Sequence, residues 1–267
     1  MLVRITGLVA FAALGATATA ASISTYPGSI AVLGHSGATG YNSNPARPGQ
    51  DAPENSWATG SNPAVDSIYR RILAHNRAIK SHAYNFAVDG SNIDDMAEQA
   101  REMVSLRTKP ALVLIQTIDN DIRCDGTDPQ NYKPYAAKLA KVLGTIAKGA
   151  PKARVFIVSV WGTARVYADA VKGLPAAGRS DKEGTGLCDV LDLSGKPRAS
   201  GIAATDTIVK SYQRQVAQTC ARFSNCRYDN GALFRLVVHT ADLTPDGNHL
   251  SVRGQQKMAA AAWAALY

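Results

Sequence analysis

The chain has 267 residues, of which 46% are hydrophobic and 19% charged, and its formal net charge is +8. This length suits one sizeable α/β domain, and the composition excludes a disordered or fibrous protein. The basic residues are scattered, without a run of five or a zinc-finger pattern. We therefore expect a solvated surface and no nucleic-acid partner.

Residues 1–20 have the pattern of an export signal. Arg4 gives a short cationic start, an apolar run extends from Ile5 to Leu14, and Ala18-Thr19-Ala20 forms a small-residue cleavage site. An uncleaved anchor is the alternative, but the run is shorter than the ~20 residues that a bilayer requires. We predict removal of residues 1–20, a single domain over 21–267, and a secreted or periplasmic protein without a stable membrane anchor. Loss of Arg4 lowers the formal charge from +8 to +7.

Strand and helix patterns alternate along the rest of the chain. Apolar runs predict strands at 29–33, 82–88, 111–116, 153–160 and 233–238, and helical spacing predicts helices at 62–80, 92–107, 131–148, 205–222 and 251–266. Pro63 suits a first helical position, and Asn92 and Ser251 are candidate caps. Residues 161–204 lack clear periodicity, and we therefore predict a long functional loop there. The alternation predicts a parallel sheet flanked by helices.

The four cysteines predict two disulfide bonds, because an even number in an exported chain favours pairing. They are Cys124, Cys188, Cys220 and Cys226. Three pairings are open, and we favour Cys220 with Cys226, which lie close in sequence, and Cys124 with Cys188. There is no C-x-x-C spacing or His/Cys cluster, so we expect no metal and no other cofactor.

Three polar or small residues follow successive predicted strands. Ser36 follows the first strand, Gly90 the second and Asn120 the third. Ligands of open parallel sheets bind beyond the carboxyl ends of the strands. We therefore expect these residues to line one rim. Taken alone, Gly90 is better explained by a strand-to-helix turn, and Asn120 by an ordinary turn or cap residue.

A serine hydroxyl needs a neighbouring base to act as a nucleophile. His249 is the strongest candidate, since Asp246 precedes it by three residues in a loop and can fix its tautomer. His239, followed by Asp242, is the alternative, but it ends an apolar run and reads as a structural residue. Acyl transfer also needs oxyanion donors. The backbone N–H groups of Ser36 and Gly90 and the side-chain amide of Asn120 could supply them.

Taken together, these residues resemble the SGNH, or GDSL-type, hydrolase superfamily. Its four blocks occur in order as Gly34-His35-Ser36, Gly90, Ile118-Asp119-Asn120-Asp121 and Asp246-Gly247-Asn248-His249. The resemblance implies a flavodoxin-like three-layer α/β/α sandwich with a mostly parallel sheet. It also implies a triad of Ser36, His249 and Asp246 and an oxyanion hole of Ser36, Gly90 and Asn120.

The chain departs from the family pattern at two positions. His35 stands where the family has Asp, and Ile118 stands where it has Gly. We expect a local structural role for His35. Because Ile118 replaces a flexible glycine, the family pattern defines the position of Asn120 less well than its identity. Ser36 also resembles the nucleophile of an α/β-hydrolase elbow, but Ala38 replaces the second glycine of G-x-S-x-G.

The resulting prediction is a carboxylic ester hydrolase, an esterase or lipase, that acts through an acyl-serine intermediate. Its expected partner is a small-molecule or polymer-borne ester, and the expected state is a monomer. There are two alternatives. A non-catalytic carbohydrate- or envelope-binding module could keep the same fold, and an acyltransferase could use the same acyl-enzyme. Trp57 is expected to pack in the fold in preference to stacking on a sugar.

Overall fold

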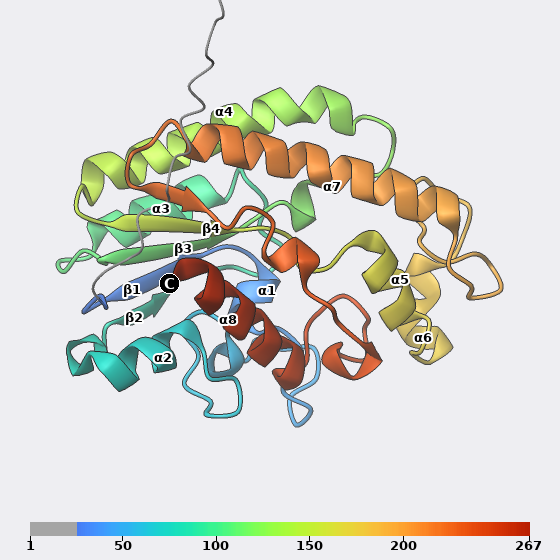
Figure 1. Ribbon diagram of the computed structural model, residues 1–267, viewed down its shortest axis with the longest axis horizontal. Helices are drawn as coiled ribbons and strands as arrows, with labels where there is room; N and C mark the ends of the chain where they lie inside the picture. The colour runs from blue at the N-terminus through green and yellow to red at the C-terminus, as the bar shows by residue number, and fades with distance from the viewer. Residues whose placement is uncertain (1–25) are drawn as a thin grey trace, which may run out of the picture.

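The computed structural model describes residues 26–267, so the predicted signal peptide lies outside the described residues. Its centre is a five-stranded parallel sheet of order β2-β1-β3-β4-β5 (Figure 1). The strands are β1 (Ile30–Leu33), β2 (Ala83–Asn85), β3 (Leu112–Gln116), β4 (Arg154–Val158) and β5 (Cys226–Tyr228). This order is that of flavodoxin-like doubly wound sheets.

Helices cover both faces of the sheet and complete three layers. One face carries α3 (Met96–Ser105), α4 (Asp128–Gly149) and α7 (Ala199–Cys220), and the other carries α2 (Ile68–His75) and α8 (Val252–Leu266) (Figure 1). The other helices of the described residues are α1 (Ser36–Thr39), α5 (Ala164–Val171) and α6 (Ala176–Arg179). The predicted α/β/α architecture is confirmed.

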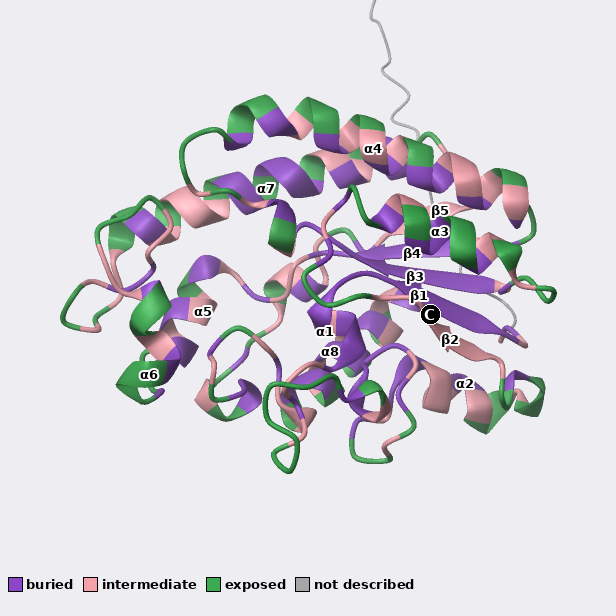
Figure 2. Ribbon diagram, turned by 180° about the vertical axis from the view of Figure 1, so that it is seen from behind, coloured by how far each residue is buried: buried purple, intermediate pink, exposed green. Residues whose placement is uncertain are grey.

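The central strands are buried on both faces, as Figure 2 shows in purple. Successive strand residues point to opposite faces. In β1, Ile30 and Val32 therefore join the cluster under α2 and α8, whereas Ala31 and Leu33 join the cluster under α3, α4 and α7. This two-sided burial explains why the strands read as continuous apolar runs in the sequence.

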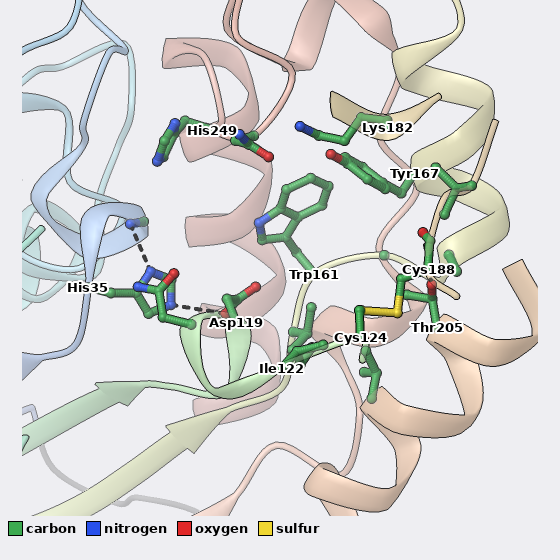
Figure 3. A pocket seen from close by; sticks show the side chains of 18 of the residues that line it. His35, Asp119, Ile122, Cys124, Trp161, Tyr167, Lys182, Cys188, Thr205 and His249 are labelled. Atoms are coloured by element: carbon green, nitrogen blue, oxygen red, sulfur yellow. Dashed lines mark hydrogen bonds and ion pairs between the residues drawn. A yellow bond between two sulfur atoms is a disulfide. The ribbon is translucent and has the colours of Figure 1, made fainter. Parts of the chain in front are cut away.

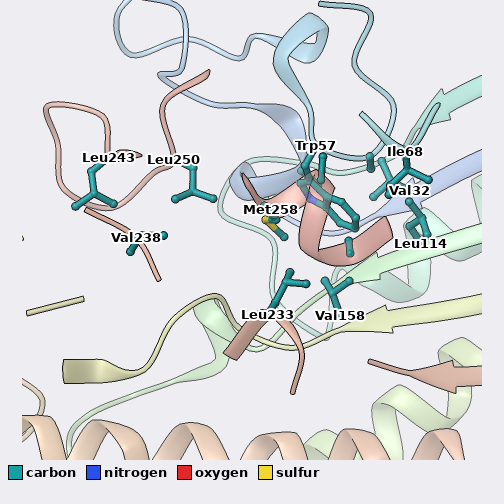
Figure 4. Close-up of a cluster of buried hydrophobic side chains, with 14 of the residues drawn as sticks. Val32, Trp57, Ile68, Leu114, Val158, Leu233, Val238, Leu243, Leu250 and Met258 are labelled. Atoms are coloured by element: carbon teal, nitrogen blue, oxygen red, sulfur yellow. The ribbon is translucent and has the colours of Figure 1, made fainter. Parts of the chain in front are cut away.

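Trp57 is a core residue of the α2/α8 face. Its side chain is fully buried, near Val32, Leu114 and Met258 (Figure 4). Its indole Nε1–H donates to Gln116 Oε1 at 2.7 Å. The expectation that Trp57 packs within the fold is confirmed, and the indole also anchors a glutamine at the end of β3.

The predicted strand at 233–238 is wrong. The fifth strand is β5, which pairs with β4, and Leu233–Arg235 forms a 3₁₀ turn. The Asp229 carboxylate stabilises this turn, because it accepts hydrogen bonds from the backbone N–H groups of Gly231 and Leu233. β5 has only three half-buried residues at the sheet edge, too few for an apolar pattern.

The segment 161–204 is more structured than its sequence predicts. It contains α5, α6 and the first residues of α7, which begins at Ala199 and not at 205. Thr163 caps α5 by accepting from the N–H of Val166, and Asp206 accepts from the N–H of Ala164. A carboxylate from a later helix thus fixes the start of α5, a contact that no local pattern reveals.

Two helix starts also differ from prediction. α2 begins after its cap Ser67, which accepts from the N–H of Arg70, so Pro63 is not its first residue. α3 begins at Met96, whereas Asn92 accepts from the N–H of Asp94 in the preceding turn. Ser251 caps α8 as expected, by accepting from the N–H of Gly254.

Both favoured disulfide bonds are present. Cys124 is joined to Cys188, and Cys220 at the end of α7 is joined to Cys226 at the start of β5. Across residues 26–267, no helix is long and apolar enough to cross a membrane.

Candidate active site

A cavity of about 680 Å³ opens beyond the carboxyl ends of the strands. The loops after β1, β2 and β3 contribute Ser36, Gly90 and Asn120 to its wall, and His249 comes from the loop before α8. The structure therefore brings these predicted residues to one rim. Trp161, Tyr167 and Lys182 from the 161–204 segment line the opposite wall (Figure 3).

Ser36, His249 and Asp246 form a hydrogen-bonded chain. The Nε2 atom of His249 lies 2.9 Å from Ser36 Oγ, and its Nδ1 atom lies 2.9 Å from Asp246 Oδ2. A carboxylate can only accept, so Nδ1 carries the proton and Nε2 is free to accept from the serine hydroxyl. This is the arrangement that a serine nucleophile requires.

Asp246 lies in a dense set of donors. Besides His249, it accepts hydrogen bonds from the Asn42 side-chain amide, the Thr244 hydroxyl and the backbone N–H of Asn248. Burial opposes ionisation of Asp246, but the hydrogen bonds from His249, Thr244 and Asn42 outweigh it. They hold the pKa of this carboxyl well below its usual range, so Asp246 stays charged beside the imidazole.

Buried glutamines support the turn that carries Ser36. Gln99 on α3 accepts from the N–H of Gly34 at 2.8 Å and donates to the carbonyl of the same residue at 2.9 Å. Gln255 on α8 donates to the Gly37 carbonyl. Gly37 packs so tightly that a Cβ atom there would lie 2.2 Å from Gln116 Nε2. The turn that carries Ser36 is therefore fixed from three sides.

The oxyanion candidates occupy suitable backbone positions. Gly90 has φ +73°, a left-handed conformation in which glycine is favoured. One N–H of the Asn120 amide donates to the Ser91 carbonyl at 2.9 Å. That bond orients the Asn120 amide, whose residue also lines the cavity.

Ile118 adopts a backbone conformation that suits glycine, with φ 96° and ψ −51°. A β-branched residue in this region is strained. The carbonyl of Ile118 accepts from the N–H of Asp121 at 2.7 Å, which closes the turn around Asn120. Ile118 therefore holds a backbone conformation that favours glycine, and it stores strain beside a candidate oxyanion donor.

His35 is buried, with 5% of its surface exposed, and bridges two loops. Its Nδ1 accepts from the N–H of Gly37 at 3.2 Å, and its Nε2 lies 2.9 Å from Asp119 Oδ2 (Figure 3). The expected local structural role of His35 is consistent with these contacts, which begin α1 as its N-cap.

Asp121 is a buried carboxylate behind the site. Its Oδ1 accepts from the N–H of Ile93, whereas its Oδ2 has no hydrogen-bond partner. Burial, reinforced by the charges of Asp94 and Asp119, raises the pKa of Asp121 to about 6. Asp121 thus ties the loop after β3 to the loop that contains Ser91.

The remaining histidines lie away from the cavity wall. His239 is exposed, and its backbone N–H donates to Asp242, which in turn pairs with Arg253 and Lys257. His75 ends α2 and stacks on Tyr26 with ring centroids 4.3 Å apart. Among residues 26–267 no group of three or more potential metal ligands is present.

The supports of the site that sequence reasoning missed include Asn42, Thr244 and Gln99. Asn42 is 204 residues from Asp246, and Gln99 is 65 residues from Gly34. Thr244 opens the Thr244-Pro245-Asp246 run, and a hydroxyl two residues before the carboxylate could have been read as its donor.

Comparison with known proteins identifies the family of the chain. The family model for GDSL-like lipases and acylhydrolases matches residues 30–262. A search of curated proteins by sequence found no match. Solved structures with this fold include phospholipase A1 from Streptomyces albidoflavus NA297, which is 13% identical with a TM-score of 0.51 over 89% of this chain and 99% of that one.

Two further structures share the fold. The lipase Lip_vut3 from a goat rumen metagenome is 13% identical, with a TM-score of 0.55 over 90% of this chain and 97% of that one. A carbohydrate esterase family 2 enzyme from Corynascus thermopiles (Myceliophthora fergusii) is 15% identical, with a TM-score of 0.52 over 93% of this chain and 68% of that one. Because the family model spans most of the chain, this protein belongs to the GDSL-like lipase/acylhydrolase family, whose members are carboxylic ester hydrolases.

Proposed function

We propose that the protein is a secreted serine hydrolase that cleaves carboxylic esters through an acyl-enzyme on Ser36. The observation that carries this proposal is the unbroken chain from Ser36 Oγ through His249 to the ionised Asp246. A non-catalytic binding module has no need for this chain, so its presence at the cavity favours chemistry.

In the first half-reaction, Ser36 Oγ attacks the ester carbonyl carbon while His249 Nε2 takes the hydroxyl proton. The carbonyl oxygen becomes an oxyanion, for which the proposed donors are the backbone N–H groups of Ser36 and Gly90 and the Asn120 amide. Removing one such donor typically lowers the rate about 100-fold to 1000-fold. His249 then protonates the leaving alcohol as the carbon–oxygen bond breaks.

In the second half-reaction, a water molecule attacks the acyl-serine, again with His249 as base. The proton returns to Ser36 Oγ when the carboxylic acid leaves. Asp246 stabilises the imidazolium in both halves, because its carboxylate remains charged. An alcohol in place of water would give acyl transfer by the same steps.

One part of the cavity wall suits an apolar acyl group. It consists of Ile122, Val160, Val190, Val209 and Phe234, whereas Asp181, Lys182 and Asp189 give the wall a charged part as well. Pockets of this size bury most of a small ligand. The fold neighbours named above are a phospholipase, a lipase and a carbohydrate esterase, so they support ester hydrolysis without selecting the alcohol.

The proposed location rests on two features. The first is the cationic and apolar pattern of residues 1–20. The second is the pair of disulfide bonds, which persist in oxidising compartments. We propose a monomer with one domain over residues 21–267.

Hydrolysis of p-nitrophenyl acetate and of longer acyl homologues tests the proposal. The oxidised mature protein is expected to hydrolyse at least one member, and Ser36→Ala is expected to remove that activity. Adding an acceptor alcohol and analysing the products distinguishes hydrolysis from acyl transfer. Equal rates for both proteins across the series would contradict the proposal.

A further inference from the structure

The loop after β1 carries Ser36, and the loop after β3 carries Asn120. β1 and β3 are paired neighbours in the sheet. One direct side-chain bridge joins the two loops: His35, the residue before the serine, contacts Asp119, the residue before the asparagine. The two partners are 84 residues apart in sequence.

The contacts of His35 indicate which of its ring nitrogens donates and which accepts. The Gly37 N–H donates to Nδ1, so Nδ1 has no proton. The proton of the neutral ring is then on Nε2, which donates to Asp119 Oδ2 at 2.9 Å. Hydrogen bonds to ionised acceptors are stronger than neutral ones, and only 7% of the His35 side chain is exposed.

The loop after β3 needs this support because its backbone is strained. Ile118 has φ 96°, and the 3₁₀ turn Asp119–Asp121 follows directly. Asp119 is tied to His35 at one side of the turn, and the Asn120 amide is tied to the Ser91 carbonyl at the other. Strained conformations persist only where their surroundings fix them.

From these contacts we infer that His35 and Asp119 are positioning residues, which hold the Asn120 turn at a fixed distance from Ser36. This inference rests on the proposed function. Neither side chain performs a chemical step. His35 sets the start of α1, Asp119 sets the turn, and their hydrogen bond aligns the nucleophile with an oxyanion donor. Errors of about 1 Å in such alignment can lower rates about 100-fold.

Three variants separate the bridge from the helix cap. His35→Asn keeps a good N-cap acceptor for the Gly37 N–H but has no group at the position of Nε2. Asp119→Ala removes the acceptor. Asp119→Asn is the matched control, since its amide oxygen can still accept from His35.

Steady-state kinetics on the best p-nitrophenyl ester provide the first test. His35→Asn and Asp119→Ala are each expected to lower kcat at least tenfold, with KM within about twofold, and Asp119→Asn to retain most activity. The double variant H35N/D119A is expected to be no slower than the worse single variant, because both remove one interaction. Additive losses, or unchanged kcat in both single variants, would overturn the inference.

Backbone hydrogen–deuterium exchange provides a second test that does not depend on hydrolysis. The peptide covering 118–121 is expected to exchange faster in H35N and D119A than in the wild type, and D119N to match the wild type. Unchanged exchange in H35N and D119A would overturn the bridge. If the protein shows no hydrolysis that depends on Ser36, the proposed function is refuted. The exchange result alone then tests whether the His35–Asp119 hydrogen bond holds the turn.

Discussion

Asp246 binds His249 through both of its carboxylate oxygens. Oδ2 accepts from Nδ1 of the imidazole at 2.9 Å, and Oδ1 accepts from the backbone N–H of the same residue at 3.1 Å. The carboxylate therefore fixes both the ring and the peptide that carries it. Asn42 and Thr244 hold the carboxylate in turn.

This geometry predicts the effect of Asp246→Asn. The amide would donate where the carboxylate accepts, or rotate and break the bond to Nδ1, so the imidazole would lose its tautomer preference. We expect kcat to fall about 10³-fold to 10⁴-fold. Asn42→Ala, which removes one supporting donor, is the milder control and is expected to lose less than about tenfold. Comparable losses in both variants, measured by steady-state kinetics, would contradict this role for Asp246.

The buried carboxyl of Asp121 predicts a pH-dependent stability. Its pKa of about 6 in the folded protein lies above the unfolded value of about 3.9. The native state therefore binds more protons between these values, and this stabilising contribution is complete below about pH 4 and lost as pH rises through 6. The shift corresponds to a stabilisation on the order of 3 kcal/mol.

Asp121→Asn removes this titration. We expect the melting temperature of the variant to rise relative to the wild type as pH increases from 4 to 8. Thermal denaturation across that range measures the difference. A constant offset between the two proteins at every pH would show that Asp121 does not titrate in this way.

The strain at Ile118 predicts that the alanine and glycine variants reverse their usual order of stability. Ile118→Ala removes the buried side chain but keeps a Cβ in the positive-φ conformation, whereas Ile118→Gly removes both. Glycine normally destabilises an element relative to alanine. At this position we expect Ile118→Gly to be the more stable variant by about 1 kcal/mol. Denaturant titration compares them, and an alanine variant as stable as the glycine variant would refute the strain.

The two disulfide bonds are expected to differ in their effects. The Cys124–Cys188 bond closes a separation of 64 residues, and the Cys220–Cys226 bond closes one of 6. From loop-closure entropy, the first bond is expected to stabilise the folded state by about 4 kcal/mol and the second by about 2 kcal/mol. Only the Cys124–Cys188 bond lies in the cavity wall, so its double serine variant should also lose activity. Equal activity losses for both pairs at a temperature where both variants are folded would contradict this distinction.

The triad arrangement was predictable because simple rules place its members. Ser36 follows a buried apolar strand, parallel strands end at one rim, and Asp246 precedes His249 within one loop. The structure brings them together at hydrogen-bond distance. Their catalytic roles remain a prediction.

The supporting contacts were not predictable because they join distant segments. Neither Gln99 with Gly34 nor His35 with Asp119 is a local pair. β5 was missed because three half-buried edge residues carry no periodicity, and α5 because Asp206 fixes its start from α7. The sequence pattern reports burial and local spacing, whereas these features depend on tertiary contacts.

Covalent labelling of the mature protein with a fluorophosphonate, followed by peptide mass spectrometry, tests the central claim most directly. An activated serine reacts with such a reagent, whereas an ordinary serine does not. The account predicts one adduct, on the peptide that contains Ser36, with labelling strongly reduced in His249→Ala. An unlabelled Ser36 in folded wild-type protein, or equal labelling of Ser36 in His249→Ala, would contradict it.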